Sequence, residues 1–203
     1  MGSAMAISVP EFQAIHDRFR PRLLRYAARL VGPTDAEDLV QAVLIKVHEG
    51  LSGYRGEAAL STWIYRIATH AALDHLRQRA ARPATQALPE EDEARADPAR
   101  PAAASAESDA VRAEMGACVR EFVARLPPDH AAVIALAEVE GFTNPEIAAI
   151  LGVSLHTAKI RLHRARERLR RELAAGCALG PAADGEVACE RRHPIVLSRP
   201  RSP

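Results

Sequence analysis

Side chains suited to binding an unpaired nucleic acid strand gather between residues 54 and 77. At about 100° per residue, the helical positions of this segment place one tryptophan, two arginines and a histidine on one side. With two loop residues before the helix, the set is Tyr54, Arg55, Trp63, Arg66, His70 and Arg77. An indole ring stacks on a base while cations hold phosphates, so the set fits single-stranded nucleic acid. The spacing equally fits a core tryptophan beside solvated arginines.

A second basic cluster lies near residue 160 and fits duplex DNA. Residues 143–151, 152–154 and 155–169 predict a helix, a tight turn and a second helix, with Gly152 in the turn and Ser154 as N-cap. From 141 to 172 there are seven basic and three acidic residues. The candidates for reading bases and holding phosphates are Ser154, His156, Thr157, Lys159, Ile160, Arg161, His163 and Arg164. The alternative is an arginine-rich helix that merely faces water.

Acidic and amide side chains mark the start of another predicted helix, over residues 35–50. They are Asp35, Glu37, Asp38 and Gln41, with Leu39 on the inner face. Thr34 followed by Glu37 predicts a capping box here. Negative charge at a helix N-terminus stabilises the helix in itself, so these residues could serve only that purpose. The functional alternative is that they form a protein-binding surface. No carboxylate pair of a catalytic site, nucleophile–base pair or phosphate loop is evident, so we expect no enzyme.

The elements that would position these side chains are helices. Apolar residues at spacings of three and four run from Phe12 to Leu30, and Gly32 with Pro33 should end that helix. Ser61 can cap a third long helix over residues 62–80. Residues 83–110 hold seven acidic and two basic residues and four prolines, which predicts a solvated linker. We therefore expect an all-α protein with helical domains at 8–80 and 113–175, an acidic linker at 81–112, and an irregular cysteine-containing tail at 176–203.

Composition excludes several other classes. Of 203 residues, 48% are hydrophobic, which is enough to bury a core, and 4% are aromatic, with no alternating runs that would predict strands. No apolar stretch approaches the length of a spanning helix, and no signal peptide is evident, so we expect a cytoplasmic protein without membrane insertion. Three cysteines are too few for a disulfide scaffold. Cys177 and Cys189 could lie together on a hairpin around Gly180 and Gly185 and, with His193 as a further candidate, form a metal or redox site, or they could be unrelated cysteines in the tail. Otherwise we expect no cofactor.

Three segments together resemble one known family. The segments DAEDLVQAVLIKVHEGL, ALSTWIYRIATHAALDHLRQR and RLPPDHAAVIALAEVEGFTNPEIAAILGVSLHTAKIRLHRARERLRREL are similar, in this order, to the extracytoplasmic-function (ECF) sigma factors of the sigma-70 family. The resemblance covers roughly residues 10–80 and 115–175. Asn144, Ala158 and Ile160 depart from the residues usual in the family. These departures concern promoter sequence preference rather than fold.

The resemblance implies a role for each cluster. The helix with Asp35, Glu37, Asp38, Leu39 and Gln41 would bind core RNA polymerase. The Tyr54–Arg77 set would melt and read the −10 promoter element as a single strand, and the helix after Ser154 would read the −35 element as duplex. The acidic linker would lie in polymerase channels, and an anti-sigma factor would hold the protein inactive. The rival functions are a helix-turn-helix regulator that binds duplex DNA unaided, and a metal- or redox-sensing protein.

Overall fold

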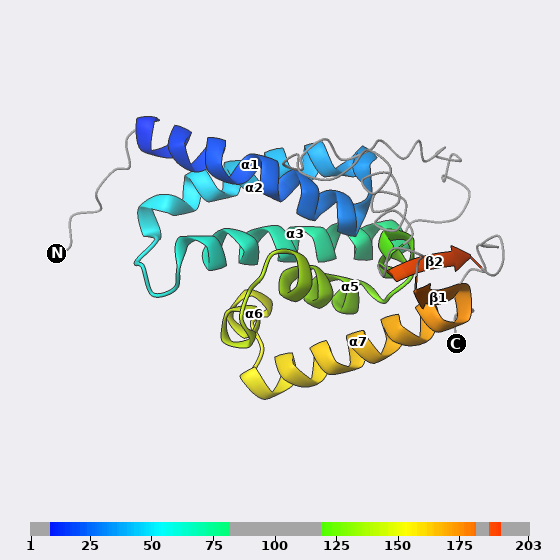
Figure 1. The fold of residues 1–203 in the computed structure, drawn as a ribbon. Helices are drawn as coiled ribbons and strands as arrows, with labels where there is room; N and C mark the ends of the chain where they lie inside the picture. The colour runs from blue at the N-terminus through cyan, green and yellow to red at the C-terminus, as the bar shows by residue number, and fades with distance from the viewer. Residues whose placement is uncertain (1–8, 82–118, 182–186, 192–203) are drawn as a thin grey trace.

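The computed structural model describes residues 9–81, 119–181 and 187–191, and all structural statements concern these residues (Figure 1). The N-terminal part consists of α1 (Val9–Val31), α2 (Pro33–Gly50), the short 3-10 helix η1 (Leu51–Gly53) and α3 (Leu60–Ala81). The C-terminal part holds helical residues 119–124, α5 (Pro128–Ile134), the π-helical turn η3 (Ala135–Val139), α6 (Asn144–Leu151) and α7 (Leu155–Gly176). The all-α prediction for the two parts is confirmed.

Two predicted helix starts in the N-terminal part are wrong. α2 begins at Pro33 with Gly32 as its N-cap, so Thr34 does not form a capping box with Glu37. Proline suits the first helical position because it has no N–H to leave unpaired, and Gly32 supplies the φ of 91° of the connection. α3 begins at Leu60, and the amide of Trp63 bonds the carbonyl of Ala59 at 3.0 Å. Ser61 therefore lies inside the helix and is not its cap.

The start of the tail is not irregular, contrary to the prediction. β1 (Cys177–Pro181) and β2 (Val187–Arg191) form an antiparallel hairpin in which Cys177 pairs with Arg191. The hairpin follows α7 directly, and Cys177 is buried beside the ring of Phe122. Gly176 is required at this junction, because a Cβ there would lie 2.5 Å from Phe122 Cζ. Close packing against residues 119–124 thus fixes where the chain leaves the helix.

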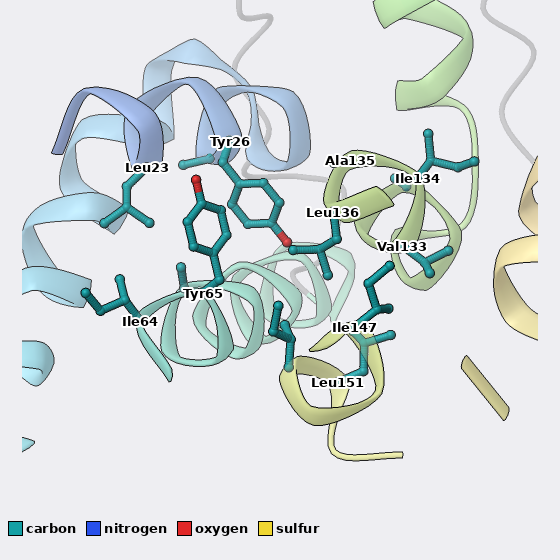
Figure 2. Close-up of a cluster of buried hydrophobic side chains, with 14 of the residues drawn as sticks. Leu23, Tyr26, Ile64, Tyr65, Val133, Ile134, Ala135, Leu136, Ile147 and Leu151 are labelled. Atoms are coloured by element: carbon teal, nitrogen blue, oxygen red, sulfur yellow. The ribbon is translucent and has the colours of Figure 1, made fainter. Parts of the chain in front are cut away.

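The two helical parts pack against each other over one shared core. α1 and α2 cover one side of α3, and α5 and α6 lie against its other side (Figure 1). Figure 2 shows Leu23, Tyr26, Ile64 and Tyr65 of the N-terminal part opposite aliphatic side chains of the C-terminal part. Those opposing side chains include Val133, Leu136, Ile147 and Leu151. α7 lies outermost and leaves one long face to solvent.

Candidate nucleic-acid interface

Trp63 is half-buried and packs within the N-terminal part. Its ring lies 5.3 Å from the ring of Tyr54, centroid to centroid, and it covers Gly50, where a Cβ would be 3.0 Å from Trp63 Cζ2. The Tyr54 hydroxyl donates a hydrogen bond of 2.5 Å to the carbonyl of Ala58, which orders the loop before α3. Trp63 therefore contributes to packing and still presents part of its ring at the surface.

The exposed side of Trp63 forms one wall of a shallow hollow of about 310 Å³ between α2 and α3. Polar and charged side chains line most of the rest, namely Lys46, Arg66, His70 and Asp74, and the apolar Ile67 and Ala71 complete the lining. His70 Nδ1 lies 2.7 Å from the Arg66 carbonyl, which fixes the imidazole against the helix. The structure thus brings Trp63, Arg66 and His70 together as predicted, and Lys46 joins them. Sequence analysis missed Lys46 because it lies on a different helix, 17 positions earlier.

Two other members of the predicted single-strand set lie away from this hollow. Arg77 forms an ion pair with Asp74 and lines a different hollow, of about 370 Å³, with His130 and Arg161 of the C-terminal part. Arg55 is exposed in the loop before α3. Burial, and then the nearby guanidinium groups of Arg168 and Arg161, lower the pKa of His130. His130 therefore adds no positive charge to the second hollow near neutral pH.

The helix-turn-helix of the C-terminal part is fixed by its caps. Thr143 caps α6 in a capping box with Glu146, whose Oε2 accepts hydrogen bonds from the Thr143 amide at 2.8 Å and from its hydroxyl at 2.7 Å. Both hydrogen bonds lower the pKa of the Glu146 carboxyl, and the bond from the Thr143 hydroxyl has the larger effect. Gly152 adopts a φ of 65° in the turn, and the Ser154 hydroxyl accepts from the Thr157 amide at 3.1 Å to start α7. The predicted turn and N-cap are confirmed.

α7 presents the predicted face to solvent. Ala158, Leu162 and Ala165 are buried against α5 and α6. The opposite positions are exposed: Ser154, His156, Thr157, Lys159, Ile160, His163 and Arg164. Arg161 differs, since it is half-buried and lies 3.5 Å from the Asp129 carboxylate at the start of α5. An exposed row of imidazole, ammonium and guanidinium groups near a helix N-terminus can approach base edges and phosphates of a duplex.

Some acidic side chains at the start of α2 form ion pairs with neighbouring helices, and others are exposed. Asp35 accepts from His75 Nε2 at 2.8 Å and lies 3.5 Å from Arg79 Nη1, and Glu37 pairs with Arg20 of α1. These contacts fasten α2 to its neighbouring helices, and Leu39 is half-buried.

Asp38 and Gln41 are exposed, and Ile45 follows them on the same helix face with 53% of its surface exposed. An exposed aliphatic residue beside polar groups is typical of a protein-binding surface. Sequence analysis did not identify Ile45, although its spacing from Gln41 was a usable signal.

No metal site is present in the described part of the chain. Within those residues there is no group of three or more histidine, cysteine, aspartate or glutamate side chains that could hold a metal ion. Cys177 is buried, the backbone of Cys189 pairs with that of Leu179, and His193 lies outside the described residues. None of the described helices is long and apolar enough to cross a membrane.

Comparison with known proteins identifies the family. The Sigma-70 region 2 model matches residues 15–82, and the Sigma-70 region 4 model matches residues 116–169. The chain is also 34% identical over 154 residues to ECF RNA polymerase sigma factor SigM of Mycobacterium tuberculosis, a match covering 75% of this chain and 72% of that protein. The chain belongs to the ECF group of the sigma-70 family. Region 2 thus corresponds to α1–α3, and region 4 to the C-terminal helices. The hollow beside Trp63 lies in region 2, and the exposed face of α7 lies in region 4.

The matches to relatives from several bacteria span most of this chain. The chain is 34% identical over 169 residues to ECF RNA polymerase sigma factor SigE of Mycolicibacterium smegmatis, a match covering 82% of this chain and 63% of that protein. It is 31% identical to the RNA polymerase sigma-H factor of Pseudomonas aeruginosa, covering 77% of this chain and 82% of the relative.

Two solved structures share the fold. One is the sigma factor RpoE of Bartonella quintana in complex with the anti-sigma factor NepR, with a TM-score of 0.62, 24% identity, and coverage of 82% of this chain and 98% of that one. The other is CnrH in complex with the cytosolic domain of CnrY, with a TM-score of 0.59, 22% identity, and coverage of 85% and 93%.

Proposed function

We propose that this ECF sigma factor binds core RNA polymerase and directs it to promoters with a −10 and a −35 element. The observation that supports the proposal is that one chain of this family carries two different surfaces whose side chains suit nucleic acid. The hollow beside Trp63 suits an unpaired base and its phosphates, and the exposed face of α7 suits a major groove. A factor of this kind confers specificity on the polymerase and carries out no catalysis itself.

Each surface has its own role in the proposal. Region 2 holds the melted −10 strand with Trp63 as the stacking platform, Lys46 and Arg66 as phosphate ligands, His70 beside them in the hollow and Tyr54 against the Trp63 ring. Region 4 reads the −35 duplex with the residues of α7 that face solvent, the phosphates being held by Lys159 and Arg164.

Core polymerase is proposed to bind the exposed α2 face of Asp38, Gln41 and Ile45, while Asp35 and Glu37 orient that helix through their own ion pairs. Because the sigma factor RpoE, which shares this fold, was solved in complex with the anti-sigma factor NepR, an anti-sigma factor is the proposed regulator of this chain as well.

Gel filtration with a bacterial core RNA polymerase tests the proposal, beside binding to promoter duplex without polymerase. We expect the chain to co-elute with core and to bind duplex alone only weakly and with strong salt dependence. Asp38→Arg should abolish co-elution, whereas Asp17→Arg, the same reversal at an exposed aspartate of α1, should not. Tight duplex binding with no affinity for core would instead identify a helix-turn-helix regulator that acts unaided.

A further inference from the structure

The exposed row of side chains along α7 contains one large aliphatic residue, Ile160. Its surface is 37% exposed, and it lies five positions after Leu155, the first residue of the helix. At about 100° per residue, Ile160 lies about 200° around the helix axis from Ala158, which is fully buried. Ile160 therefore points away from the core of region 4, near the middle of the face that meets solvent.

Polar side chains surround Ile160 on this face. Positions three and four residues away are the neighbours of a residue on a helix surface. All four of these neighbours are exposed and carry hydrogen-bonding groups: His156, Thr157, His163 and Arg164. A surface for an apolar protein partner would place further aliphatic residues here. Residues 141–172 instead hold seven basic and three acidic residues, so a polyanionic duplex is the complementary occupant.

The floor of a DNA major groove offers one apolar substituent to such a side chain. Base edges present hydrogen-bond donors and acceptors there, and the exception is the 5-methyl group of thymine. An isoleucine held against a polar base edge would remove water from that edge without giving it a new partner, which costs free energy. Against a thymine methyl, the same side chain buries apolar surface on both partners. Thymine is therefore the base whose edge suits Ile160.

The place of Ile160 along α7 also suits contact with a base. In a helix-turn-helix, residues near the N-terminus of the second helix contact base edges. Ile160 lies in the second turn of α7, about 7.5 Å along the axis from Leu155. Lys159 and Arg164, which we assign to phosphates, lie on opposite sides of Ile160 around the helix axis. With both cations on the DNA backbone, Ile160 faces the floor of the groove.

We propose that Ile160 selects a thymine, and hence an A·T pair, in the duplex that region 4 reads, through contact with the thymine 5-methyl group. The inference rests on the proposed function, because it names a base within the −35 element. Ile160 is then a specificity-determining residue, whereas Lys159 and Arg164 bind the backbone of any sequence. Removal of the methyl group from this contact should weaken binding about fourfold, the effect of one buried carbon group.

Replacement of thymine by uracil tests the contact, because uracil differs from thymine only in lacking the 5-methyl group. The full-length chain, without polymerase and at low salt, is used to select duplexes from a pool with a randomised core. The wild type should enrich an A·T pair at a position where Ile160→Ser enriches none. Uracil in place of the thymine of that pair should weaken wild-type binding about fourfold in fluorescence anisotropy and leave Ile160→Ser unaffected. Ile160→Val, which keeps an aliphatic side chain, should retain most of the uracil effect.

Val119→Ser is the matched control, because Val119 is an aliphatic residue of region 4 that is 41% exposed and lies outside α7. It should select the same sequences as the wild type and show the same loss with uracil. Circular dichroism should show unchanged helix content in all three variants.

Three results would each overturn the proposal: no A·T position that separates the wild type from Ile160→Ser, a full uracil effect in Ile160→Ser, or the same loss of selection in Val119→Ser. The selection needs no polymerase, so the two proposals can fail separately. A methyl effect in a chain that never co-elutes with core would support the thymine contact and refute the proposed function. A chain that co-elutes with core and shows no methyl effect would refute the thymine contact alone.

Discussion

At the scale of single residues, the geometry of Trp63 is compatible with both roles that the sequence left as alternatives. The indole packs on Gly50 and Tyr54, as a core anchor would, and its other side lines the hollow with Lys46 and Arg66. Spacing along one helix could not separate these roles, because a half-buried ring satisfies both. Packing already holds the ring in place. A base that stacked on it would therefore cost less side-chain conformational entropy.

Replacing Trp63 should therefore affect promoter melting more than polymerase binding. We expect Trp63→Phe to reduce open-complex formation a few-fold and Trp63→Ala to reduce it by about tenfold or more, since base stacking contributes ~1–3 kcal/mol per base. Core binding by gel filtration should persist in both. Permanganate footprinting of the −10 region measures the effect. If Trp63→Ala instead loses helix content together with core binding, the tryptophan is only a core anchor.

Lys159 and Arg164 are the exposed cations of the α7 face, and we assign them to phosphates. Each substitution by alanine should weaken duplex binding by a similar factor on promoter and non-promoter sequences and lower the slope of log K against log salt by about 1. Arg170→Ala is a suitable control, because Arg170 pairs with Glu167 near the other end of the same helix. Fluorescence anisotropy over a salt series measures the slope. Unchanged slopes for both would remove these residues from the DNA surface.

At the scale of elements, patterning predicted which segments are helical better than where they begin. The apolar spacing along α1, α2 and α7 was sufficient to predict that these segments are helical, because one face of each helix is buried. The start of α2 was misplaced because Pro33 was interpreted only as a helix end, although proline equally favours a first helical position. The tail was predicted to be irregular, with a hairpin as only one possibility, because its glycines and prolines indicate chain breaks and the packing of Cys177 on Phe122 is a tertiary effect.

The capping box of α6 predicts a pH-dependent contribution to stability. Hydrogen bonds from Thr143 lower the folded-state pKa of Glu146 below its ordinary value of 4.5, so the stabilisation is fully present above that value and is lost as pH falls through the lower folded pKa. Glu146→Gln keeps a capping acceptor but removes the negative charge at the helix N-terminus, so it should cost about 0.3–1 kcal/mol at pH 7 and less in acid.

Urea unfolding of both chains between about pH 7 and pH 3 measures this difference. Glu57→Gln, at an exposed glutamate in the loop before α3, should leave stability unchanged throughout. A Glu146→Gln difference that stays constant over the whole pH range would show that the carboxylate is not the capping group.

At the scale of the whole molecule, the sequence predicted two helical parts but not their contact. The Tyr65 hydroxyl donates a hydrogen bond to Glu140, yet the two residues lie 75 positions apart, and neither belongs to a pattern that pairs it with the other. Glu140 is an ordinary charged residue in the sequence, and it becomes a buried one only when region 4 lies on α3. A contact between two parts that lie far apart in the sequence leaves no periodic signal, so this arrangement could be learned only from the structure.

The packing of region 4 on region 2 predicts how the free chain responds to DNA that offers both elements. A −35 duplex carrying a premelted −10 strand about 25 base pairs away should bind the wild type hardly better than the −35 duplex alone, because such elements lie about 85 Å apart and a compact chain of this length is roughly 45 Å across. Arg22 of region 2 lies 3.3 Å from Glu140 of region 4, so Glu140→Arg should separate the regions. This variant should gain about tenfold from the second element, since separated regions present region 2 at an effective concentration near millimolar. Anisotropy titrations of both chains, with a scrambled −10 strand as control, measure the two gains. Equal gains would mean that the regions of the free wild type are already independent, and the contact between α3 and α6 would then have no bearing on promoter occupancy.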